Sequence, residues 1–136
     1  MPHLIIEYTK NLEGHVDKQA FIDETHKIAL ATGIFKPGGI KVRLHVVDDF
    51  KIADGHPDNG FIHIHMRIGY GRDEETRSSA AEQIFQHLAE WLEPVFANRP
   101  FGFSVELNEI PPETNYKKNN LHDYLAKRAE QNSNRD

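Results

Sequence analysis

The sequence predicts an α+β fold: two βαβ units that form a four-stranded mixed sheet with two helices on one face, followed by a short C-terminal helix. Four segments alternate apolar and polar residues with a period of two, as β-strands do. Two further segments, each lying between a pair of these strands, repeat their apolar residues with the period of a helix. The chain has 136 residues, which is enough for one domain with a hydrophobic core but too few for two ordinary ones.

The first βαβ unit is expected over about residues 2–48. Its predicted elements are a strand at 2–8, a helix at 17–32 and a strand at 39–47. Asp17 can accept hydrogen bonds from the first turn of this helix, and Gly33 can end it in a left-handed conformation. A right-handed helical crossover then makes the two strands parallel.

The second unit is expected over about residues 61–109. Its predicted elements are a strand at 61–70, a helix that begins after Asp73 and a strand at 101–109. Asp73 is a candidate N-cap, and Pro94 is expected to kink or end the helix. The apolar stripe of this helix contains Ala80, Ala81, Ile84, Phe85, Leu88, Leu92 and Val95.

Outside these units the composition is more polar. Residues 53–60 form a loop between the units, and residues 110–128 form a C-terminal extension with a short helix near 121–127. Residues 129–136 are expected to be a polar tail. We expect residues 1–128 to form a single domain.

The alternation gives the predicted sheet two chemically different faces. The apolar face, expected under the two helices, consists of Leu4, Ile6, Ile40, Val42, Leu44, Val46, Ile62, Ile64, Met66, Ile68, Phe101, Phe103, Val105 and Leu107. The polar face consists of His3, Glu7, Lys41, Arg43, His45, His63, His65, Arg67, Ser104, Glu106 and Asn108. Because this face is rich in His and Arg but has one Lys, we expect a wet, charge-paired interface between subunits. A solvated face is the alternative.

The composition argues against several classes of function. The chain contains no cysteine, which excludes disulfides, thiolate zinc sites and cysteine nucleophiles. Its formal charge of −5 argues against a nucleic-acid partner, and no apolar run is long enough to span a membrane. The N-terminus shows no secretory signal, so a cytoplasmic location is expected.

Pro2 is the first candidate catalytic residue. Aminopeptidases remove an initiator Met that precedes a small residue such as proline, and removal would leave a secondary amine at the start of the first strand. The ordinary pKa of an α-amino group is about 8, and nearby cations or apolar surroundings lower it. A neutral proline nitrogen near pH 7 would be an effective general base. The alternative is that Met-Pro has no chemical role.

Three cations are expected to converge on Pro2. Arg72 follows the third strand, whereas Lys41 and Arg43 lie near the start of the second. If the first and third strands are antiparallel neighbours, these residues meet at the end of the sheet where the chain begins. A guanidinium binds a carboxylate with two parallel hydrogen bonds, so the cluster suits an anionic substrate. Ordinary surface ion pairs are the alternative for each cation.

His63 and His65 lie on the same face of one strand, with His45 expected nearby. Such a pair can bind zinc or iron when a third ligand is present. The sequence shows no third ligand at a diagnostic spacing, so no metal site is predicted. The histidines are expected to fill the polar interface instead.

Short stretches spread over nearly the whole chain, to about Lys127, follow a known pattern. They are Pro2-His3 with Ile5-Ile6-Glu7, Ala31-Thr32-Gly33-Ile34-Phe35, Gly39-Ile40 running to His45 and Asp48, Ala53-Asp54-Gly55, Ile68-Gly69 with Gly71-Arg72, and Asn119-Asn120 with His122. In this order they resemble the tautomerase superfamily and, more closely, the 5-carboxymethyl-2-hydroxymuconate Δ-isomerase family.

The resemblance implies a homotrimer with its helices outside and its sheets facing inward. It also implies cofactor-free 1,3-proton transfer on a polycarboxylate of the 2-hydroxymuconate type, as in the catabolism of the aromatic compound homoprotocatechuate. Pro2 matches the catalytic proline of this family, and Arg72 matches an arginine that binds substrate carboxylate. Lys41 stands where relatives have arginine, with Arg43 two positions on, so the residue that binds the 2-oxo acid end stays open.

The sequence therefore predicts an isomerase in which neutral Pro2 takes and returns a proton and Arg72 binds a carboxylate. Lys41 or Arg43 would stabilise negative charge on the 2-oxygen of the substrate. Decarboxylation or hydration on the same scaffold is one alternative, and it needs a further acid, for which Glu7 is the candidate. A non-catalytic trimeric binding protein is the other. Neither nucleic acid nor a membrane is expected as a partner.

Overall fold

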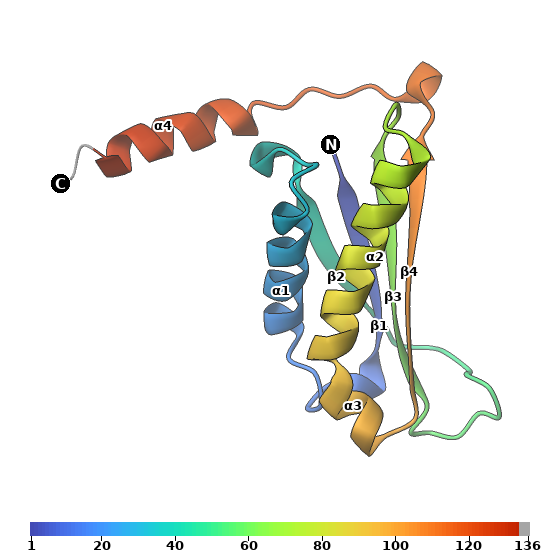
Figure 1. Cartoon of the computed structure of the whole chain (residues 1–136). Helices are drawn as coiled ribbons and strands as arrows, with labels where there is room; N and C mark the ends of the chain where they lie inside the picture. Colours follow the sequence, from blue (N-terminus) through green and yellow to red (C-terminus); the bar gives the residue numbers. More distant parts are fainter. Residues whose placement is uncertain (134–136) are drawn as a thin grey trace.

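The elements follow the order that the sequence predicts. The computed structural model describes residues 1–133 and contains two strand–helix–strand units followed by a C-terminal helix (Figure 1). The strands are β1 (His3–Thr9), β2 (Lys41–Val47), β3 (Gly60–Gly69) and β4 (Phe101–Ile110). The helices are α1 (Lys18–Ala31), α2 (Glu74–Trp91), α3 (Glu93–Asn98) and α4 (Leu121–Ser133), and short 3-10 turns lie at η1 (Lys10–Leu12), η2 (Pro37–Gly39) and η3 (Pro112–Thr114).

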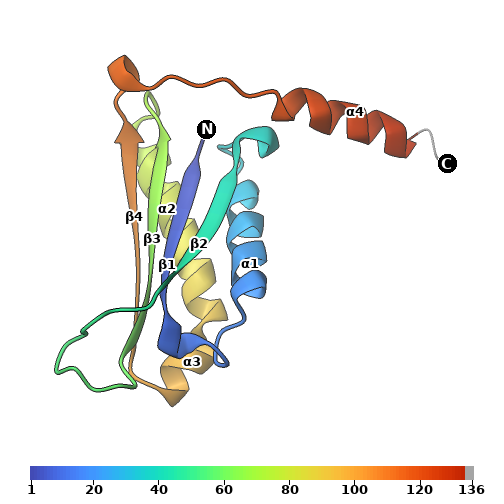
Figure 2. The same ribbon diagram turned by 180° about the vertical axis from the view of Figure 1, so that it is seen from behind.

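The four strands form one mixed sheet in the order β2-β1-β3-β4. The pairs β1–β2 and β3–β4 are parallel, whereas β1 and β3 are antiparallel. Helices α1 and α2 lie side by side on one face of this sheet (Figures 1 and 2). The predicted α+β fold is therefore confirmed. The antiparallel pairing also places the beginning of β1 beside the end of β3.

Both long helices on the sheet begin where the sequence predicts. The side chain of Asp17 accepts a hydrogen bond from the backbone nitrogen of Ala20 at 2.7 Å. In the same way Asp73 accepts one from the backbone nitrogen of Thr76 at 2.8 Å. Gly33 follows α1 with a φ of 77°, a conformation that lets the chain leave the helix and that glycine adopts without strain.

The buried core lies between the sheet and the two helices. Its largest fully buried side chains are Tyr8, Phe21, Leu4, Ile6, Leu12, Ile62, Ile64, Met66, Ile68, Ile84, Leu88 and Leu92. These side chains come mainly from the central strands β1 and β3. The apolar residues of β2 and β4 are only half-buried, because each of these strands has a neighbour on one side alone.

Two details of α2 refine the sequence prediction. Phe85 was expected in the buried stripe but is 41% exposed, and it stacks on Phe103 with 5.5 Å between the ring centroids. Phe85 lies at the margin of the apolar stripe of α2, where the helix packs over the edge strand β4. Pro94 coincides with the end of α2, as expected, and the chain continues as α3 with Pro94 in its first turn, where no N–H is needed.

The C-terminal helix is longer than predicted. It extends to Ser133, so residues 129–133 of the expected polar tail are helical, while residues 134–136 lie outside the described part. Ala, Glu, Gln and Lys favour helices even where no apolar stripe is present. α4 is exposed along its length and projects away from the sheet (Figures 1 and 2). Across residues 1–133, we find no helix with the length and apolar character needed to cross a membrane.

Truncation of Ile64 tests this description of the core. We expect Ile64→Ala to lower the free energy of unfolding by about 2–5 kcal/mol, because it leaves a cavity at a fully buried position. Urea unfolding at a fixed protein concentration measures the change. Leu30→Ala is the control, because Leu30 is 40% exposed on α1 and its truncation should cost much less. Equal losses in both variants would contradict the assignment of the core.

Candidate active site

A cavity of about 480 Å³ opens at the end of the sheet where the chain begins. Four parts of the chain form its wall: the amino terminus, the connection from α1 to β2, the turn after β3 and the extension before α4. The lining residues are Met1, Pro2, Ile34, Phe35, Lys36, Gly39, Arg72, Lys117, Asn119 and His122. Two of the predicted site residues, Pro2 and Arg72, therefore meet in one cavity.

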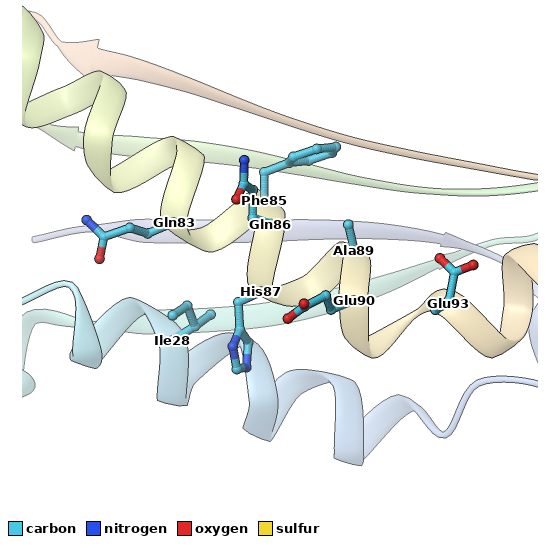
Figure 3. A pocket seen from close by; sticks show the side chains of 8 residues that line it. All are labelled: Ile28, Gln83, Phe85, Gln86, His87, Ala89, Glu90 and Glu93. Atoms are coloured by element: carbon cyan, nitrogen blue, oxygen red, sulfur yellow. The ribbon is translucent and has the colours of Figure 1, made fainter.

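A larger cavity of about 860 Å³ lies on the outer side of the helices. Figure 3 shows its lining side chains, which come mostly from α2, with Ile28 from α1 and Glu93 from the start of α3. His87 in this wall contacts Glu24 at 2.6 Å, and the other ionisable residues there are Glu90 and Glu93. An acidic wall does not suit an anionic substrate, and none of the predicted site residues lines it. We therefore assign the candidate active site to the smaller cavity.

Pro2 is buried at the start of β1. Its carbonyl oxygen accepts a hydrogen bond from the backbone nitrogen of Lys41 at 3.0 Å, which fixes it against β2. The backbone of Gly39 passes close by, since a Cβ there would lie 3.4 Å from Cδ of Pro2. In the chain that begins with Met1, the nitrogen of Pro2 is an amide, and the free amino group in the cavity belongs to Met1.

The surroundings of the amino-terminal nitrogen disfavour its protonation. Burial is the largest cause that lowers the pKa of this ammonium below its usual 8.0, and the charges of Lys117, Lys41 and Arg72 lower it further, in that order. A lowered pKa enlarges the neutral fraction of the amine near pH 7. The site thus places a nitrogen base in a cationic cavity.

Arg72 is held beside the cavity by its neighbours. Its Nη2 donates to the carbonyl oxygen of Ile34 at 2.8 Å, and its guanidinium carbon lies 5.3 Å from the ring centroid of Phe35. Arg77 donates to the carbonyl oxygen of Arg72 and pairs with Glu109 at 3.3 Å, which anchors the turn after β3. Within residues 1–133 no carboxylate forms a salt bridge with Arg72, so its guanidinium is available to an anionic ligand.

Lys41 and Arg43 lie on the polar face of β2 and not in the cavity wall. Lys41 pairs in register with His3, and its ammonium nitrogen is buried with no hydrogen-bond partner in the described part of the chain. The Nη1 atom of Arg43 contacts Nδ1 of His3 at 3.0 Å. The cluster predicted from the sequence therefore includes Arg72 and has Lys41 at its edge, whereas Arg43 lies outside it.

The C-terminal extension contributes residues to which the sequence gives no role. Lys117, Asn119 and His122 all line the cavity. Asn119 and His122 are among the residues that carry the resemblance to the family, but nothing in the sequence places them near Pro2. Nothing in the sequence predicts that Lys117 lines the cavity, because it lies in a polar stretch before a predicted helix.

The histidines of the polar face contact neighbouring side chains. His63 contacts Oγ of Ser104 at 2.6 Å and a carboxylate oxygen of Glu106 at 3.1 Å. Nε2 of His65 contacts Oδ1 of Asn108 at 2.7 Å. In the part of the chain that the structure describes, no three metal-ligating side chains are grouped to hold an ion. These contacts instead tie β3 to β4 across the polar face.

Comparison with solved structures first shows the class of fold to which the protein belongs. A solved fused 4-OT, the W0 wild-type symmetric trimer, matches with a TM-score of 0.59 at 18% identity, over 85% of this chain and 93% of that chain. At this identity the likeness shows the fold alone. Together with the closer matches below, it places the chain among proteins with the tautomerase fold.

The particular family follows from closer matches. The chain belongs to the 5-carboxymethyl-2-hydroxymuconate isomerase family, whose model matches residues 2–125. It is 34% identical over 122 residues to the 5-carboxymethyl-2-hydroxymuconate Delta-isomerase of Escherichia coli, covering 90% of this chain and 97% of that protein. The crystal structure of a 5-carboxymethyl-2-hydroxymuconate isomerase from Deinococcus radiodurans R1 matches with a TM-score of 0.84 at 32% identity, over 91% of this chain and 93% of that chain. The family expected from the sequence is confirmed, and the protein is an isomerase homologue.

Changes at Arg72 should move the pKa of the amino-terminal nitrogen. Because the charge of Arg72 lowers this pKa, we expect Arg72→Gln to raise it toward the ordinary value of about 8. Arg72→Lys keeps the charge and should keep the pKa low. An NMR titration of the amino-terminal residue measures all three proteins. An unchanged pKa in Arg72→Gln would show that the charge of the guanidinium does not act on the nitrogen.

Proposed function

We propose that the protein isomerises 5-carboxymethyl-2-hydroxymuconate by cofactor-free 1,3-proton transfer, with Pro2 as the general base after removal of Met1. The observation that carries this proposal is the position of the amino terminus in a cation-lined cavity where its pKa is lowered. Removal of Met1 turns the buried Pro2 nitrogen into a secondary amine in the same surroundings. Its lone pair is then free near neutral pH, as an effective base requires.

The proton transfer uses the residues of the cavity in turn. The nitrogen of Pro2 takes the 2-hydroxyl proton of the dienol, or the equivalent proton from carbon 3 of the keto form, and either loss leaves the same dienolate with its negative charge on the 2-oxygen. Transfer from carbon 3 to the distal carbon of the keto form is the 1,3 shift. The electron pair on the 2-oxygen then forms the carbonyl bond. The carbon–carbon double bonds shift, and the distal carbon of the conjugated system takes a proton back from the protonated proline. Arg72 binds a substrate carboxylate through its guanidinium and holds the conjugated chain over the one base.

A second cation would stabilise the negative charge that develops on the 2-oxygen. Lys41 fits this role better than Arg43, because its ammonium is buried without a partner and its charge lowers the pKa of the amino-terminal nitrogen. Arg43 is engaged with His3. A lysine supplies a point charge and not the bidentate donor of an arginine, so this end of the substrate is held by charge more than by shape.

Hydration or decarboxylation receives less support from the cavity. Water activation in such a site calls for a carboxylate, and none of the described residues that line the cavity is Asp or Glu. Glu7, the candidate for this role, lies five positions along β1 and is exposed on the sheet. An amine surrounded by cations favours proton transfer on a polycarboxylate substrate over hydration or decarboxylation.

Blocking the amino terminus tests the base directly. We expect one extra residue before Pro2, or its acetylation, to lower kcat for ketonisation of 2-hydroxymuconate compounds by about 100-fold or more, because general base catalysis is lost. The same single residue added at the C-terminus is the control and should leave kcat unchanged. Turnover that survives the N-terminal block would remove Pro2 from the mechanism. A protein inactive in every form would point to the binding-protein alternative.

The proposal extends to a cytoplasmic homotrimer that acts in the catabolism of aromatic compounds such as homoprotocatechuate. Two features support the trimer. The polar sheet face has no helix over it within residues 1–133, yet it carries half-buried Ile5 among arginines and histidines. α4, which contacts the rest of its chain at η2, also exposes the side chains of Leu121, Tyr124 and Leu125. Association of three sheets around an axis would cover the first surface.

A charge at the centre of the polar face should dissociate the assembly. We expect the wild-type protein to sediment as three chains and Ile5→Lys to sediment as one, because the new ammonium would be buried between Arg43 and His65, which flank position 5 in the sheet. Lys51→Glu, an exposed change in the loop after β2, is the control and should stay trimeric. Sedimentation equilibrium gives each mass. A monomeric wild-type protein would contradict the proposed trimer.

A further inference from the structure

The C-terminal extension is fixed across the end of the sheet where the chain begins. After η3, residues 115–120 run without regular structure past the amino terminus and lead into α4 (Figures 1 and 2). The side-chain nitrogen of Asn119 donates to the carbonyl oxygen of Gly38 at 3.0 Å. The ring of His122 packs on the same glycine, where a Cβ would lie 2.8 Å from its Cγ. The extension is therefore attached to η2, at the rim of the cavity.

This attached segment carries one lysine into the cavity wall and one away from it. Lys117 lines the cavity, as Arg72 and Lys36 do, whereas the neighbouring Lys118 does not. Within residues 1–133 Lys117 forms no salt bridge. Of the charged groups that act on the amino-terminal nitrogen, Lys117 lowers its pKa most, which agrees with a position near the reacting end. An ammonium on a flexible stem suits a carboxylate whose position varies.

The number of cations around the cavity exceeds what a dicarboxylate needs. 2-Hydroxymuconate has two carboxylates, one at each end of its conjugated chain. 5-Carboxymethyl-2-hydroxymuconate has a third carboxylate on its side arm. Arg72 in the wall can pair with one carboxylate, and Lys41 at the edge of the cluster can act on a second through its charge. The third carboxylate requires another positive charge in the wall, for which Lys36 and Lys117 are the candidates, since an unpaired charge in a partly desolvated site is costly.

We infer that Lys117 binds a substrate carboxylate that Arg72 does not hold, so that the C-terminal extension selects substrates by the number of their carboxylates. The inference rests on the proposed function and adds a subsite to it. Asn119 and His122 act as positioning residues, because they hold the extension on Gly38. The subsite therefore depends on a segment that follows the whole βαβ repeat in the sequence.

Two adjacent lysines make a matched test of this subsite. We compare Lys117→Gln with Lys118→Gln on 5-carboxymethyl-2-hydroxymuconate and 2-hydroxymuconate, at a pH where the amine is neutral in every protein. We expect Lys117→Gln to lower kcat/KM about 10- to 100-fold more for the tricarboxylate than for the dicarboxylate, mainly through KM, because a hydrogen bond between charged groups is lost. Lys118→Gln should keep the wild-type ratio.

Equal losses on both substrates would overturn the inference, because they would mean that Lys117 does not bind the carboxylate that only the tricarboxylate carries. A wild-type ratio in Lys117→Gln would overturn it as well. Lys36→Gln adds a second check on the identity of the cation. If Lys36→Gln changes the ratio and Lys117→Gln does not, the third carboxylate binds at Lys36 and the inference about Lys117 is wrong.

Unreactive probes separate the subsite from the reaction. Calorimetry measures the binding of propane-1,2,3-tricarboxylate and pentanedioate to the wild type and both lysine variants. We expect Lys117→Gln to weaken binding of the tricarboxylate more than that of the dicarboxylate. If this holds although neither muconate is turned over, the proposed reaction fails and the subsite stands. If Lys117→Gln binds both probes as the wild type does, the subsite is wrong whatever the activity.

Discussion

Positive charge is concentrated around the amino-terminal nitrogen, and the rest of the site depends on this concentration. Burial and the charges of Lys117, Lys41 and Arg72 lower the pKa of that nitrogen, and the same charges attract an anionic substrate. One arrangement thus favours the neutral form of an amine and provides positive charge that suits a carboxylate. The cations repel one another, and no carboxylate among the described lining residues relieves that repulsion. A polycarboxylate substrate would supply the missing negative charge.

The sheet is what brings these charges to one place. The parallel pairing of β1 with β2 sets Lys41 beside the start of the chain, and the antiparallel pairing of β1 with β3 sets Arg72 there too. The strands β1 and β3 are central and fully buried on one face, which holds the start of the chain and the turn that carries Arg72 in place, and the edge strand β2 is fixed by its pairing with β1. The extension then adds Lys117 from the far end of the chain. Three distant parts of the sequence therefore define one electrostatic environment.

The sequence predicts well what depends on local pattern. Alternation locates the four strands, and the caps at Asp17 and Asp73 lie where side-chain chemistry puts them. The sequence does not predict features that depend on contacts between distant segments of the chain. Asn119 reaches Gly38 across 81 positions, and no periodicity reports such a contact. The direction of Arg43 is likewise set by His3 on the neighbouring strand, which the composition of β2 alone does not reveal.

The mass of the intact, purified and active chain tests the central claim most directly, because the claim requires a free amine at Pro2. We predict a mature chain that begins with Pro2, so that the measured mass is lower than that of the full sequence by one methionine residue. A fully active protein that retains Met1 would contradict the account, because the nitrogen of Pro2 would then be an amide whose lone pair is delocalised into the carbonyl group and does not accept a proton.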